Sequence, residues 1–73
     1  MYTADHEENT RKNTALGIVL EHVPALAGVR VVWAFDQARK LVLILPAGVN
    51  PGLVIAIQNT CNTRLGAGKV LVV

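Results

Sequence analysis

The sequence predicts a small α+β domain with the element order αββαβ, in which two helices pack on a three-stranded sheet. Three observations predict this fold: two stretches with apolar residues at alternate positions, two stretches with apolar residues at helical spacing, and an aliphatic run at the end. The chain has 73 residues, so it forms one domain at most and buries about 60% of the surface that the unfolded chain exposes. Apolar residues make up 52% of it, which suggests that some apolar surface faces a partner, and a homodimer is the simplest case.

The fold is expected to be organised around a hairpin between Gly28 and Leu45. Asp36 opens a connection that lacks the glycine of a two-residue turn, so we expect a type I turn within a loop of three to five residues. The hairpin contains the only Trp and Phe, so the core is expected to form there. The residues expected to share its core face are Val29, Val31, Trp33, Phe35, Leu41, Leu43 and Leu45.

Local signals define the other elements. Thr14 is a suitable N-cap and Pro24 a stop, which predicts a first helix over residues 15–23. Asn50 followed by Pro51 predicts the start of a second helix, and Gly66 its end. A third strand over residues 69–73 should be parallel to the second, since a helix connects them. In the second helix an apolar stripe is expected at Leu53, Val54, Ile57, Cys61 and Leu65, with Gln58, Asn59, Asn62 and Thr63 facing water.

The first twelve residues are polar and contain no Ile, Leu, Val or Phe. Asn and Thr residues oppose the few helix-stabilising ion pairs that this segment could form. We therefore expect residues 1–12 to form a flexible N-terminal tail and residues 13–73 a single compact domain. The element order resembles a ferredoxin-like βαββαβ unit without its first strand, which is a likeness of topology alone.

The chemistry-bearing residues predict neither catalysis nor a cofactor or metal site. No acidic residue follows Asp36, and Cys61 lies on the apolar stripe, where an inert buried thiol is expected. The segment from Gly66 to Lys69 resembles part of a phosphate-binding loop, but it leaves a helix and enters a strand, so a helix cap and turn is expected. The single cysteine and the absence of a signal sequence or a spanning helix favour a cytoplasmic protein.

Six residues are candidates for partner binding. Tyr2, Arg11 and Lys12 belong to the expected tail, and Arg30, Arg39 and Lys40 belong to the hairpin. Tyr and Arg are favoured at interfaces. For the hairpin cations a solvated rim is the favoured interpretation. The alternative is a small basic patch for an acidic protein surface or a phosphate backbone, which leaves weak RNA binding as an alternative function.

The whole chain resembles the small transcription regulators encoded by lytic bacteriophages. The resemblance rests on the length of 73 residues, the polar opening MYTADHEENTRKNT and a small mixed α/β body without an active site. It implies a non-catalytic protein that binds host bacterial RNA polymerase near the RNA exit channel, close to nascent RNA. Such a protein would inhibit host promoter recognition and promote antitermination in the host cytoplasm.

Overall fold

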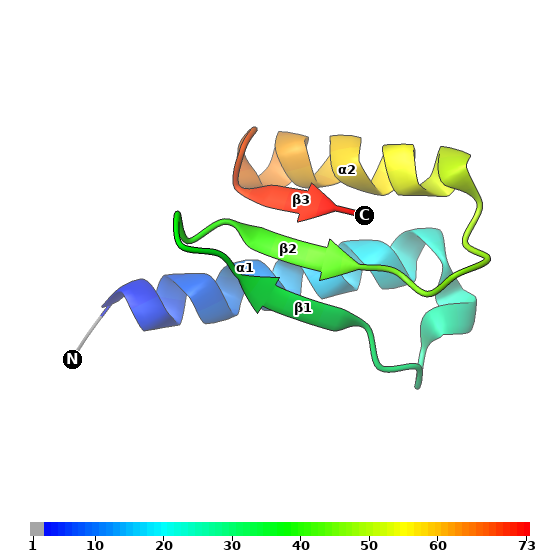
Figure 1. Cartoon of the computed structure of the whole chain (residues 1–73), viewed down its shortest axis with the longest axis horizontal. Coiled ribbons are helices and arrows are strands. Elements are labelled where there is room, and N and C mark those ends of the chain that lie inside the picture. Colours follow the sequence, from blue (N-terminus) through cyan, green and yellow to red (C-terminus); the bar gives the residue numbers. More distant parts are fainter. Residues whose placement is uncertain (1–2) are drawn as a thin grey trace.

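Two helices and a three-stranded sheet make up the structure, which is a computed structural model that describes residues 3–73 (Figure 1). The predicted α+β class and the αββαβ order are confirmed, with one added turn of 3₁₀ helix after the first helix. The elements are α1 (Thr3–His22), η1 (Pro24–Leu26), β1 (Val32–Phe35), β2 (Leu41–Ile44), α2 (Pro51–Leu65) and β3 (Val70–Val72).

The sheet has the order β1-β2-β3, so β2 is the central strand. β1 pairs with β2 antiparallel, with Trp33 opposite Leu43, and β2 pairs with β3 parallel, with Leu43 opposite Val72. The expected hairpin and parallel crossover are therefore both present. At the turn, the N–H of Arg39 donates to the carbonyl of Asp36 at 3.0 Å, and Asp36 Oδ1 accepts from the N–H of Ala38. This is the expected type I turn, initiated by an aspartate.

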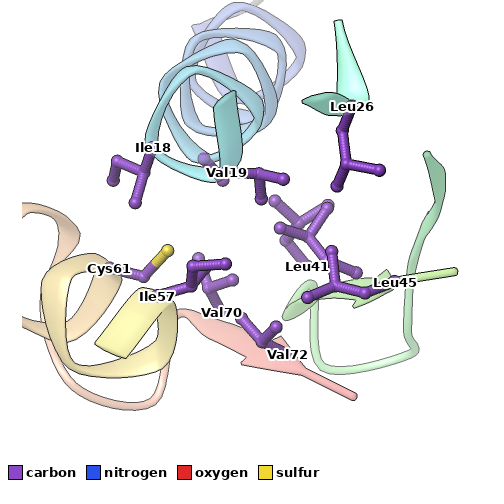
Figure 2. Packing of buried hydrophobic residues seen from close by; sticks show 11 residues of the cluster. Ile18, Val19, Leu26, Leu41, Leu45, Ile57, Cys61, Val70 and Val72 are labelled. Carbon is purple, nitrogen blue, oxygen red and sulfur yellow. The ribbon is translucent and has the colours of Figure 1, made fainter. Parts of the chain in front are cut away.

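Both helices pack on the same face of the sheet, and the core lies between them and β2 (Figures 1 and 2). Leu41 and Leu43 of β2 are fully buried and contribute the largest apolar side chains from the sheet. Ile18 of α1 and Ile57 of α2 belong to the same buried cluster and enter it from the helix side (Figure 2). The buried set is Ala15, Ile18, Val19, Leu26, Leu41, Leu43, Leu45, Ile57, Cys61, Val70 and Val72.

The ends of α2 agree with the local signals. Asn50 Oδ1 accepts from the N–H of Gly52 at 2.7 Å, and Pro51 occupies the first helical position. At the other end, Gly66 has a φ of 102°, a conformation that disfavours residues with a Cβ, and its N–H donates to the carbonyl of Asn62. The helix thus begins and ends where its own sequence predicts.

α1 begins earlier than the sequence predicts. The expectation of a flexible tail over residues 1–12, with a helix only from residue 15, is wrong for residues 3–12, which form the first half of α1. This half is held by contacts with the hairpin: Glu8 pairs with Arg39 at 3.0 Å, and Lys12 Nζ lies 4.9 Å from the centre of the Trp33 ring. Local helix propensity underestimates the helix content of a segment that gains such tertiary contacts. The expected end is confirmed, because α1 stops at His22 before Pro24.

The two aromatic residues of β1 are less buried than the sequence predicts. The core was expected to form around the Trp and Phe of the first strand, but Trp33 is 42% exposed and Phe35 only partly buried. Their rings contact each other edge to face with centroids 6.0 Å apart. β1 is an edge strand, and the fully buried core centres on the central strand β2 instead.

Gln58 of α2 was expected to face water, and it binds the outer edge of β3 instead. Its Nε2 donates to the carbonyl of Val70 at 2.8 Å, and its Oε1 accepts from the N–H of Val72 at 2.9 Å. Nε2 also donates to Asn62 Oδ1 at 3.0 Å. The side-chain amide therefore replaces a neighbouring strand and satisfies the main-chain groups that an edge strand leaves unpaired.

Arg39, in the turn, has a φ of 62°, which lies in the left-handed region that favours glycine. Replacing Arg39 by Gly or by Val removes the same ion pair with Glu8, but only Val clashes with this backbone conformation. We expect Arg39→Val to lower the free energy of unfolding by about 1–2 kcal/mol more than Arg39→Gly does. Urea unfolding followed by circular dichroism measures the difference, and equal stabilities of the two variants would contradict the turn geometry.

Candidate protein-binding surface

The sheet face opposite the helices is covered by no element of residues 3–73 (Figure 1). Strand pairing places its side chains in two rows. One row joins Val32 and Ile44 across β1 and β2, and the other joins Ala34, Val42 and Leu71 across all three strands. We call this surface the outer sheet face and define it as Val32, Ala34, Val42, Ile44, Leu71 and Val73.

All six side chains of the outer sheet face are aliphatic, and most are well exposed. Val32 is 56% exposed, Ile44 47%, Leu71 42% and Val73 55%. A sheet with one face in water normally alternates apolar with polar residues, so that the outward side chains are hydrophilic. Contiguous exposed apolar surface of this kind marks interaction sites in soluble proteins.

Charged groups border the outer sheet face at the hairpin end. The N–H of Asp36 donates to the carbonyl of Lys40, and the N–H of Leu41 donates to the carbonyl of Lys69, so the three charged residues follow one another across the sheet. Asp36 and Lys69 are exposed and Lys40 is partly buried. With two lysines and one aspartate, this border carries a net positive charge.

Among the predicted partner-binding residues, the structure gives Arg11 and Lys12 contacts within the chain. One terminal nitrogen of Arg11 donates to the carbonyl of Arg39 at 2.9 Å, and Lys12 lies over Trp33. Both side chains are partly buried. They therefore fasten α1 to the hairpin, while Tyr2 lies outside the described residues.

The three hairpin cations do not form one patch. Arg39 and Lys40 lie at the turn, whereas Arg30 precedes β1 at the opposite end of the strand. At about 3.3 Å per residue, Arg30 is about 20 Å from Asp36 at the far end. Arg39 also forms its ion pair with Glu8, although its side chain remains 60% exposed.

The environment of Cys61, in the core, shifts the pKa of its thiol. Its side chain is fully buried against the core, and burial raises the pKa of the thiol, an effect that the nearby Arg64 guanidinium partly offsets. A thiol with a raised pKa carries little thiolate at neutral pH and is a poor nucleophile. Within residues 3–73, no three His, Cys, Asp or Glu side chains gather in a way that could hold a metal ion.

Comparison of the chain with family models, with curated proteins and with solved structures finds no match. None of the helices described here is long and apolar enough to cross a membrane.

The outer sheet face was not among the predicted sites, although the sequence contains a signal for it. In the hairpin, the residues between the expected core positions are themselves apolar at Val32, Ala34, Val42 and Ile44. A strand with apolar residues on both faces normally lies between two layers. The signal indicates a sheet that is buried on both sides, and the structure covers only one of them.

Proposed function

We propose that this protein is a non-catalytic binding domain that acts by covering part of the surface of another protein. The observation that carries the proposal is the outer sheet face, a contiguous aliphatic surface on the side of the sheet that neither helix covers. Burial of apolar area is the main favourable term in protein association, and it requires no reactive group.

The charged border specifies the partner further. A net positive border at Asp36, Lys40 and Lys69 favours a partner with an apolar patch rimmed by carboxylates, since complementary charges steer association and exclude other partners. Bacterial RNA polymerase is the partner that the resemblance to phage transcription regulators implies. On that proposal the domain inhibits promoter recognition and promotes antitermination by occupying the polymerase surface near the RNA exit channel.

Two isoleucine-to-lysine variants test the surface. Ile44 lies in the outer sheet face and is 47% exposed, whereas Ile55 lies on α2 and is 62% exposed. We expect Ile44→Lys to weaken binding to purified bacterial RNA polymerase at least about tenfold, which corresponds to 1.4 kcal/mol, because a buried ammonium replaces an apolar contact. Ile55→Lys, which adds the same charge elsewhere, should bind like the unmodified protein. Surface plasmon resonance measures both.

The outcomes separate the two parts of the proposal. Equal binding by Ile44→Lys and the unmodified protein would overturn the outer sheet face as the interface. Absence of binding by the unmodified protein would overturn RNA polymerase as the partner. Circular dichroism of both variants establishes that any loss reflects the interface and not the fold.

A further inference from the structure

The two edges of the sheet differ in how their main-chain groups are satisfied. At the β3 edge, Gln58 binds the carbonyl of Val70 and the N–H of Val72. At the β1 edge no element of residues 3–73 lies alongside the strand (Figure 1). Edge strands with free main-chain groups are templates for pairing with another strand.

The hairpin hydrogen bonds show which groups of β1 point outward. The N–H of Asp36 donates to Lys40 across the hairpin, and this pair continues the register in which Ala34 lies opposite Val42. Because antiparallel pairs alternate, the N–H and carbonyl groups of Ala34 and Val32 face β2, and those of Trp33 and Phe35 face away from it. Within the described part of the chain, neither Trp33 nor Phe35 has a hydrogen bond on that outward side.

We propose that a second copy of this chain pairs with β1 along this edge, antiparallel and about a two-fold axis between the two Trp33 residues, to form a continuous six-stranded sheet. This goes beyond the proposed function, because it concerns self-association at the edge and leaves the outer sheet face free. In this register Trp33 pairs with Trp33 of the second copy, and Val31 pairs with Phe35 of the second copy. These pairs join the outward main-chain groups by about six hydrogen bonds.

Charge complementarity selects this register. With the axis at Trp33, Arg30 lies opposite Asp36 of the second copy, and symmetry creates the same pair twice. Both residues are exposed and form no ion pair among the described residues. Shifting the axis by one residue places Arg30 opposite Ala34 or Ala38 instead, which loses both pairs. Opposite charges directly across antiparallel strands stabilise a sheet.

An apolar groove beside the edge adds to the main-chain bonds. Its volume is about 250 Å³, and it lies between α1, η1 and the segment before β1. Its lining is aliphatic except for Gly28 and Arg30, and consists of Leu16, Leu20, Leu26, Gly28, Val29, Arg30 and Val31. Val31 is also the residue opposite Phe35 of the second copy, so the phenyl ring of that copy lies beside the groove. Edge pairing buries less area than a standard protein–protein interface, and small interfaces form weak complexes. We therefore expect a dissociation constant on the order of micromolar.

Cysteine substitutions test the register directly. In the proposed dimer Val32 lies opposite Ala34 of the second copy in a pair without hydrogen bonds, whose Cα separation of about 4.5 Å suits a disulfide. The double variant Val32→Cys with Ala34→Cys should therefore form a covalent dimer on mild oxidation, visible on a non-reducing gel. Each single variant should stay monomeric on that gel, and Cys61 is buried and does not interfere. Cross-linking by Ala34→Cys alone, or none by the double variant, would overturn the register.

Analytical ultracentrifugation of the pure protein tests the dimer and its charges without any other partner. We expect a reversible monomer–dimer equilibrium, and Arg30→Glu should raise the dissociation constant at least about tenfold, because two attractions become two repulsions. Asp36→Asn should raise it less, since it removes the charge but keeps the oxygen that accepts from Ala38 and Lys40 in the turn. Lys69→Glu makes the same charge change at the far strand and should have no effect. A monomer at several hundred micromolar, or an unchanged constant in Arg30→Glu, would overturn the proposal.

Discussion

Replacing Leu43 by alanine is expected to lower the free energy of unfolding by about 2–5 kcal/mol. Leu43 is fully buried on the central strand, where side chains from both helices pack against the sheet. Its truncation removes apolar contacts and leaves a cavity that surrounding elements fill only in part. A domain of this size has a total stability of about 4–11 kcal/mol, so the loss is a large fraction of it.

The next residue on the same strand is a matched control. Ile44 points to the outer sheet face and is 47% exposed, so Ile44→Ala should cost about 1 kcal/mol or less. Urea unfolding followed by the fluorescence of Trp33, the single tryptophan, measures both variants. Equal destabilisation by Leu43→Ala and Ile44→Ala would contradict the orientation of β2.

Gln58→Ala is expected to have the second largest effect, because it removes the partners of two main-chain groups, the Val70 carbonyl and the Val72 N–H. An unsatisfied group costs about 1–3 kcal/mol, and the lower part of that range applies to partly buried hydrogen bonds, so we expect a loss of about 2–4 kcal/mol in the free energy of unfolding. Amide hydrogen exchange measured by NMR provides a local test, because the Val72 N–H should exchange faster in the variant. Unchanged protection of Val72 would contradict the role of Gln58 as an edge cap.

Two further variants show which part of the amide matters. Asn62→Ala removes only the acceptor at 3.0 Å from Gln58 and should cost less than about 1 kcal/mol. Gln58→Glu keeps an acceptor for Val72 but replaces the donor to Val70 by a carboxylate oxygen. Its stability relative to the unmodified protein should therefore improve at acid pH, where protonation restores a donor to the Val70 carbonyl.

The outer sheet face and the β1 edge have separate consequences for association. In the proposed dimer, the two-fold axis runs through the sheet, so both copies of the outer sheet face lie on the same side. Ile44→Lys changes that face and Arg30→Glu changes the edge, so loss of polymerase binding and loss of dimerisation can be observed independently. A dimer that presents two such faces would also bind a partner with two adjacent patches more tightly than a monomer does.

The sequence by itself determined the elements whose signals are local. Alternation at period two predicted the hairpin and the core positions of β2, Asp36 predicted its turn, and Asn50 with Gly66 predicted the ends of α2. These signals act through residues only a few positions apart: a side chain that accepts from a nearby N–H, or a backbone conformation that one residue type favours. The parallel crossover followed from the presence of a helix between two strands.

Only the tertiary structure decided the features that depend on residues distant in the chain. The first half of α1 forms although its sequence favours a tail, because Glu8 and Lys12 reach Arg39 and Trp33 of the hairpin. The side chain of Gln58 binds main-chain groups of β3 and does not face water, because β3 lies beside α2 in the folded state. The strand order places Trp33 on an edge, and the placement of both helices on one face leaves the other uncovered. The apolar pattern of the strands indicates two buried faces, but whether a layer covers each of them depends on how many elements the chain supplies and where they pack.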